Sequence, residues 1–345
     1  MNYYLLFLIL IVVTYIFIER ILNLKNKEKI FLNVAFLEML VFLGIRDVTI
    51  GTDLKNYIPY FEMIKQADWN NFFILPLEKG YVILNKILGA IGGENFFLFV
   101  IAFISLYGVY FSIKRYSQNY FCSIFIFITF QFYIFLFSGL RQSIAFSIIW
   151  ISIKYIKERK IIKFLLLVLL ASTFHKTAII FIPVYWIANK KITVRYFSLF
   201  LITLISIFIM KGTLVTLITR YMYKEYEVSS STGGYTLLII LFIILLFFIL
   251  IRNQKIEKYK ENNIWFNMLM IAILIQSLAS TQGNIARLTM YYSYSIIFLI
   301  PNILETLEDK KQKMLIEIVI YILLFVFFLV NTQIDTLYMP YKTFF

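Results

Sequence analysis

About a dozen apolar runs, each bounded by charged or turn-forming residues, follow one another along the whole chain of 345 residues. A soluble domain of this length cannot enclose so many runs in one core. As a helix, a run of about 20 apolar residues instead matches the thickness of a bilayer. The sequence therefore predicts an all-α polytopic membrane protein with about 12 transmembrane helices, near 3–18, 30–45, 95–113, 121–137, 141–157, 161–174, 177–189, 195–210, 235–251, 263–281, 286–300 and 314–331.

Composition agrees with a membrane chain, and the basic residues give it an orientation. Hydrophobic residues make up 61% of the chain, charged residues 15%, and the net charge is +14. Placing the Lys- and Arg-rich loops in the cytoplasm satisfies the positive-inside rule and puts both termini outside. These loops are 19–29, 114–120, 154–163, 190–195, 252–261 and 305–313. The basic residues are explained as topology determinants and lipid head-group contacts, so no nucleic-acid partner is expected.

We predict one integral membrane domain over residues 1–345. The stretch 79–92 is too short and too polar to cross alone, so we expect a re-entrant or interfacial helix within the outer segment 46–94. The other long outer segment is 211–234. The first run lacks the basic start and cleavage site of a signal peptide and is predicted to be a retained span. With one Cys and one His, the chain is expected to hold no metal, and no cofactor is expected.

The predicted outer turns carry arginines that could bind an anion. Arg141 and Arg287 stand in the first turn of helices that begin outside. The positive end of a helix dipole repels a guanidinium, so an anion would make this arrangement favourable. Arginine can bind phosphate oxygens with two parallel hydrogen bonds. Together with Arg46, these residues predict a pocket for a diphosphate at the outer surface; for each arginine, contact with lipid head groups is the alternative.

Three further outer residues are candidate general bases: Asp53 in the turn "GTD", Glu78 before a Gly-Tyr pair, and His175, the only histidine. An Asx-turn and an acidic helix start are the alternative explanations for Asp53 and Glu78. We favour His175 as the base because imidazole titrates near neutral pH, although a hydrogen-bonded interfacial histidine is the alternative. Four tyrosines could stack on sugar rings or simply belong to an interfacial aromatic belt: Tyr57, Tyr81, Tyr291 and Tyr292.

At these residues the chain resembles the EpsG-like membrane proteins of exopolysaccharide and capsule loci, relatives of the Wzy-type polysaccharide polymerases. The matching motifs cover nearly the whole chain in order. They are Arg46 with "GTD" at 51–53 and Tyr57; Glu78, Gly80, Tyr81 and Asn85; "GLRQSIA" at 139–145; "FHKTAIIFIP" at 174–183; Arg287 with Tyr291 and Tyr292; and Tyr338 with Tyr341. Lys176 departs from the pattern, which has a small or polar residue there.

The resemblance implies an all-helical, C-type-like membrane glycosyltransferase that polymerises lipid-linked repeat units, as in O-antigen synthesis, on the outer face of the cytoplasmic membrane. Donor and acceptor would both be glycans on undecaprenyl diphosphate, and a co-polymerase and a flippase are candidate partners. Arg141 and Arg287 would hold the diphosphate electrostatically, supported by Arg46 and Gln142. The base would be Asp53, Glu78 or His175. A glycan ligase, a flippase and a membrane acyltransferase are the rival functions.

Overall fold

The computed structural model describes residues 3–23, 25–222, 233–251, 262–279, 284–334 and 341–345. Within these residues the regular structure is helical, apart from one isolated β-bridge between Arg46 and Thr343. The predicted all-α class is therefore confirmed. Tyr338, the predicted loop 252–261 and residues 223–232 of the predicted outer segment lie outside the described residues.

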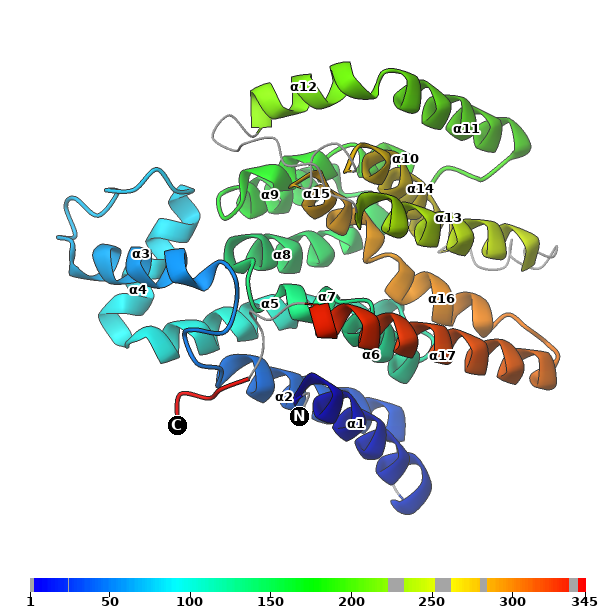
Figure 1. Ribbon diagram of the computed structural model, residues 1–345, viewed down its shortest axis with the longest axis horizontal. Helices are drawn as coiled ribbons and strands as arrows, with labels where there is room; N and C mark the ends of the chain where they lie inside the picture. The colour runs from blue at the N-terminus through cyan, green and yellow to red at the C-terminus, as the bar shows by residue number, and fades with distance from the viewer. Residues whose placement is uncertain (1–2, 24, 223–232, 252–261, 280–283, 335–340) are drawn as a thin grey trace. The chain divides into compact units, whose positions relative to one another are not determined.

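The chain divides into two compact units, of which unit 1 comprises residues 1–179 and 307–345. In this unit α5 packs against α2 and α8, α8 packs against α9, and α17 packs against α6. Its helices, shown in Figure 1, are α1 (Tyr3–Ile16), η1 (Phe17–Ile21), α2 (Lys27–Gly44), α3 (Leu54–Gln66), α4 (Lys79–Ile91), α5 (Glu94–Tyr116), α6 (Tyr120–Thr129), α7 (Phe132–Phe135), α8 (Leu140–Lys157), α9 (Ile161–Ser172) and α17 (Lys310–Ile334).

Unit 2 comprises residues 180–306, and the short helix η2 (Lys176–Phe181) joins the units along the chain. Here α14 packs against α11, α13, α15 and α16. The helices of this unit are α10 (Val184–Ile187), α11 (Val194–Ile209), α12 (Lys211–Met222), α13 (Gly233–Ile251), α14 (Asn262–Ala279), α15 (Asn284–Ser293) and α16 (Ile296–Leu304). No helix was predicted where α12 lies. The single domain over 1–345 stays a prediction.

Among the described residues, five helices are long and apolar enough to cross a membrane, and α11 with α12, bent by 80°, makes six if the pair forms one span. The five are Tyr3–Ile21, Glu94–Tyr116, Gly234–Ile251, Asn262–Ala279 and Lys310–Thr332. They identify a multi-pass membrane protein.

Each predicted run contains a helix, but the prediction of about twelve spans is not confirmed. Several helices are too short to cross a hydrocarbon layer of about 30 Å. α6 and α9 have only 10 and 12 residues, which at about 1.5 Å per residue gives less than 20 Å. The predicted span 121–137 is also broken, because Gln131 has a φ of 66° between α6 and α7.

A helical hairpin of α3 and α4 lies between α2 and α5 in the sequence (Figure 1). The helix expected at 79–92 is present as α4, whereas α3 was not predicted. One apolar core joins Tyr57 and Phe61 of α3, Tyr81 of α4 and Phe97 of α5 to the start of α8. Within it the rings of Phe61 and Phe97 stack at 4.4 Å, a geometry that contributes about 1 kcal/mol beyond burial. This core holds the first turns of α3, α4 and α8 together.

Candidate functional site

The turn at 51–53 packs against the residues that precede α8. Gly51 has a φ of 129°, and a Cβ there would lie 2.2 Å from the carbonyl oxygen of Phe137, so only glycine fits. The Thr52 N–H donates to Ser138 Oγ at 2.9 Å. Asp53 directly precedes α3, and its side chain makes no capping hydrogen bond there. The fold therefore brings the "GTD" and "GLRQ" motifs together.

The start of α4 packs equally closely against the end of α9. A Cβ on Gly80 would lie 2.3 Å from Thr173 Oγ1, and the Tyr81 N–H donates to the Thr173 carbonyl at 3.3 Å. Glu78 directly precedes α4, and His175 lies in the turn that follows α9. The close helix approach at Gly80 therefore sets Glu78 beside His175.

The Glu78 carboxylate connects two of the predicted motifs. Arg141 Nη1 donates to Glu78 Oε2 at 2.5 Å, and His175 Nδ1 lies 3.4 Å from Oε1. Oε1 also accepts the Lys176 N–H at 3.1 Å. We call Glu78, Arg141 and His175 the Glu78 cluster. Their side chains are 14%, 18% and 20% exposed, so the cluster is largely covered but part of each side chain reaches the surface.

Two predicted tyrosines support the arginine of this cluster. Arg141 Nε donates to the Tyr57 hydroxyl at 3.4 Å, and its Cζ lies 5.5 Å from the Tyr57 ring centroid. The Tyr57 ring in turn meets the Tyr81 ring edge-on, with centroids 5.9 Å apart. Both rings are buried. They hold the guanidinium in place, while their predicted stacking on sugars stays a prediction.

The electrostatics of the cluster keep Glu78 ionised. Burial raises the pKa of Glu78, but the approach of His175 Nδ1 to Oε1 and the positive charge of the Arg141 guanidinium outweigh burial and bring the pKa to about 2. Glu78 thus supplies the anion that the sequence argument required near the start of α8.

Two groups of the cluster have the chemistry of a proton acceptor and of a donor to an oxyanion. A carboxylate against Nδ1 favours the tautomer with the proton on Nδ1, so Nε2 of His175 can accept a proton. On Arg141, the amino group Nη2 takes no part in the hydrogen bonds to Glu78 and Tyr57. The cluster can therefore combine a proton acceptor with a donor to an oxyanion.

Arg46 and Gln142 also lie in unit 1, where both are buried. The Arg46 guanidinium contacts other parts of the fold. Its Nη1 donates to the Leu43 carbonyl, and its Cζ lies 5.3 Å from the centroid of the Phe137 ring. With Arg46 only 1% exposed, direct contact with a diphosphate would require the side chain to leave these partners. The substrate contacts expected for Arg46 and Gln142 stay predictions.

Three predicted residues lie on α15 in unit 2. Arg287 stands in the first turn of this helix, as expected, and is exposed. Tyr291 and Tyr292 are buried, and the Tyr292 hydroxyl donates to the Ile180 carbonyl. Whether these residues share a ligand with Arg141 stays a prediction.

Two residues that connect the motifs, Ser138 and Thr173, were not among those predicted. Ser138 accepts the Thr52 N–H, and Thr173 provides the surface on which Gly80 packs. The available signal was the glycine in each partner motif, since a glycine often marks a place where backbones approach closely. The sequence does not reveal which segment approaches it.

Comparison with known proteins agrees with the motif pattern. The EpsG family profile matches residues 29–343, a range that includes every predicted site residue. No curated protein and no solved structure matches the chain. Since the match covers most of its length, this all-helical, multi-pass membrane protein belongs to the EpsG family.

Proposed function

We propose that this protein polymerises oligosaccharide repeat units carried on undecaprenyl diphosphate, at the outer face of the cytoplasmic membrane, with a C-type-like all-helical fold. Family membership supports a polysaccharide polymerase. The observation that carries the proposal is the Glu78 carboxylate shared between Arg141 and His175, because this arrangement pairs a proton acceptor with an oxyanion donor.

The proposed step is a single displacement. The acceptor hydroxyl oxygen attacks the anomeric carbon of the donor sugar, and the bond from that carbon to the phosphate oxygen breaks. Undecaprenyl diphosphate leaves with the electrons of that bond, and Arg141 Nη2 stabilises its developing charge. The hydroxyl proton passes to His175 Nε2, and Glu78 stabilises the imidazolium that forms. One displacement inverts the anomeric configuration.

The charge distribution along α8 supports an outward-facing site. Arg141 stands in the first turn of this helix, whereas Lys154 and Lys157 stand in its last turn. Near that far end, Glu158 lies 3.8 Å from Lys154 Nζ and 2.8 Å from Lys160 Nζ. With 18 residues, α8 is about 27 Å long, close to the thickness of a hydrocarbon layer. If the lysine-rich end is cytoplasmic, the Glu78 cluster faces outside.

Reconstitution tests the function directly. The purified protein in vesicles, given a defined undecaprenyl-diphosphate oligosaccharide, should yield a ladder of products that differ by one repeat unit. A single transfer without a ladder would identify a ligase instead. Movement of the lipid-linked glycan across the bilayer without any transfer would identify a flippase, and either result would overturn the proposal.

Two substitutions test the assigned roles. Arg141→Lys should shorten the polymer and lower turnover by about 10²-fold, since lysine cannot reproduce the fixed geometry of the guanidinium. His175→Gln should lower turnover by at least about 10²-fold. Arg115→Lys, at the exposed end of α5, is the matched control and should behave as wild type. Wild-type ladders from either site variant at equal protein level would remove that residue from the mechanism.

A further inference from the structure

The segment 341–345 pairs with the residues that follow α2. The Phe344 N–H donates to the Ile45 carbonyl at 3.2 Å, and the Asp47 N–H donates to the Lys342 carbonyl at 2.9 Å. Arg46 and Thr343 thereby form an antiparallel bridge. Figure 1 shows this segment in red beside the end of α2.

Tyr341 and Arg46 cover the C-terminal end of α2. The Tyr341 hydroxyl donates to the Phe42 carbonyl at 2.6 Å, and its ring stacks on Phe42 at 4.3 Å and 7°. The Arg46 guanidinium donates to the next carbonyl, that of Leu43. The last carbonyls of a helix have no partner within the helix, and a positive charge there is favourable. These contacts fix where the chain leaves α2.

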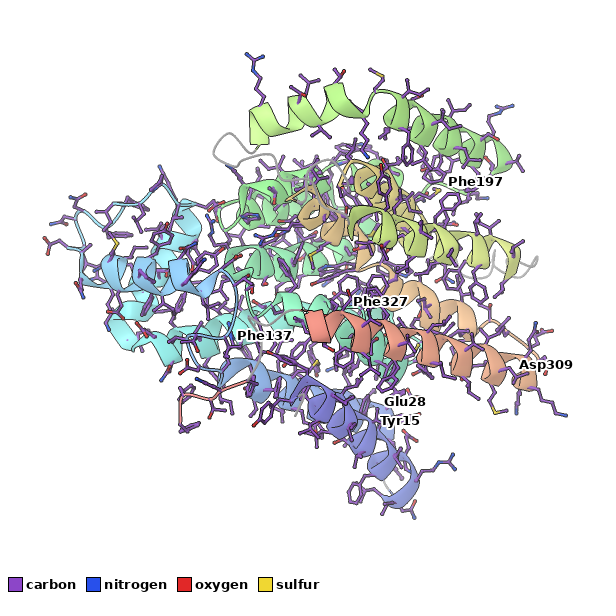
Figure 2. The ribbon with its side chains drawn as sticks, in the orientation of Figure 1. Tyr15, Glu28, Phe137, Phe197, Asp309 and Phe327 are labelled. Atoms are coloured by element: carbon purple, nitrogen blue, oxygen red, sulfur yellow. The ribbon has the colours of Figure 1, made fainter. Side chains whose placement is uncertain are left out.

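Further contacts connect Arg46, at the end of α2, with the 51–53 turn and with Arg141. Arg46 lies over the ring of Phe137, which is labelled in Figure 2 and which also meets the Phe42 ring at 6.1 Å. The Phe137 carbonyl is the atom against which Gly51 packs, and Ser138 accepts the Thr52 N–H. Gly139 then directly precedes α8, in whose first turn Arg141 lies. One run of direct contacts therefore connects segment 341–345 with the "GTD" turn and with Arg141.

We propose that Arg46, together with segment 341–345, is a positioning element that holds the 51–53 turn and the start of α8 in the arrangement that presents Asp53 and Arg141. The assignment rests on the proposed function only in taking Asp53 and Arg141 to face the substrate. Arg46 is then a positioning residue that does not contact the diphosphate, consistent with its exposure of 1%.

A disulfide reporter tests the positioning without catalysis. Thr52→Cys and Ser138→Cys, in a Cys122→Ser background, replace two hydroxyl oxygens that lie 3.0 Å apart, so the two thiols should oxidise readily. Arg46→Met and deletion of 341–345 should each slow this cross-linking several-fold. Lys342→Ala keeps the backbone hydrogen bond to Asp47, so it is the control and should cross-link as fast as the parent. If the deletion does not fold, Tyr341→Phe removes only the hydrogen bond to Phe42 and should slow cross-linking less.

Kinetics in the reconstituted assay connect positioning to the site. Arg46→Met should lower kcat by about 10- to 100-fold with little change in KM, and Arg46→Lys should recover part of the loss. Unchanged cross-linking in Arg46→Met would overturn the proposal. So would a raised KM at unchanged kcat, which would mean that Arg46 binds the substrate. If the wild type makes no polymer, the proposed function fails, while the cross-linking rates still decide the positioning claim.

Discussion

At the scale of single residues, Glu78 decides which group can act as the base. Its pKa of about 2 makes its carboxylate a weak proton acceptor at neutral pH, and general-base catalysis is most efficient when the pKa lies near the working pH. Among the three candidate bases, Glu78 is therefore better suited to orient Arg141 and His175 than to take a proton. This reasoning leaves His175 and Asp53 as the candidate bases, of which the proposed mechanism uses His175.

Replacing Glu78 should have an effect on stability that depends on pH. The folded-state pKa lies below the ordinary value of 4.5, so the stabilisation is present above that value and is lost as the pH falls towards the folded pKa. The shift corresponds to on the order of 3 kcal/mol at neutral pH. Glu78→Gln should therefore lower the unfolding midpoint at neutral pH, and the difference from wild type should shrink by about half by pH 3.

Thermal unfolding in nanodiscs, followed over this pH range, measures the effect. Glu62→Gln removes the more exposed ion pair with Lys65 and serves as the control, for which we expect little change. If the unfolding midpoints of wild type and Glu78→Gln differ by the same amount at neutral and acidic pH, the pKa of Glu78 is not depressed.

The residue types of the site could be predicted from the sequence, but their partners could not. Glu78, Arg141 and His175 were all candidates because charged groups among apolar segments are costly unless they have a role. From the sequence, Arg46 and Arg141 were both placed in the diphosphate pocket, with Arg46 in a supporting role. What distinguishes them is burial against Phe137 and segment 341–345, a tertiary property that no local pattern encodes.

At the scale of helices, the α3–α4 hairpin carries much of the site. The sequence predicted α4 but not α3, because Pro59 and several polar residues interrupt the segment. The buried residues Leu54, Tyr57, Phe61 and Ile64 nevertheless follow a helical period. Pro59 is exposed and removes one backbone hydrogen bond without disturbing the buried side. An amphipathic helix of this kind escapes a search for uniformly apolar spans.

Helix packing at Gly80 should be sensitive to a single methyl group. In Gly80→Ala the new Cβ would lie 2.3 Å from Thr173 Oγ1 and 2.8 Å from the Thr173 carbonyl. We expect α4 to move away from α9, with a loss of about 1–3 kcal/mol in stability and a fall in polymer yield as Glu78 shifts from His175. Unfolding midpoints and product ladders measure the two effects.

Gly93→Ala is the matched control, because a Cβ at Gly93 meets no atom within 4 Å. Thr173→Gly should restore part of the activity of Gly80→Ala, since it removes the side-chain part of the clash. Equal behaviour of Gly80→Ala and Gly93→Ala would show that the close approach of α4 to α9 is unimportant for the site.

At the scale of the whole molecule, the sequence predicted where helices form better than how many cross the membrane. Each apolar run contains a helix because backbone groups in an apolar environment must bond within their own segment. The number of crossings depends in addition on breaks and bends, such as the left-handed Gln131 and the 80° bend between α11 and α12. These arise from tertiary packing, which periodicity does not capture.

Orientation gives a prediction at this scale. In a Cys122→Ser background, Lys176→Cys beside the Glu78 cluster should react with a membrane-impermeant maleimide in intact cells. Lys160→Cys, beyond the other end of α8, should react only after the cells are permeabilised. Both positions are exposed, so a difference reports sidedness rather than burial. The opposite pattern would place the cluster in the cytosol and exclude the proposed reaction there.

The bridge between Arg46 and Thr343 has a consequence for biosynthesis. Tyr341 and Phe42, which also meet there, are 299 positions apart. A ribosome synthesises the chain from the N-terminus, at about 5–20 residues per second, so residues 42–47 have no counterpart until the chain has grown past residue 341. A nascent chain, or a nonsense product stopped before residue 341, would contain every motif of the Glu78 cluster but lack the contacts between segment 341–345 and residues 42–47.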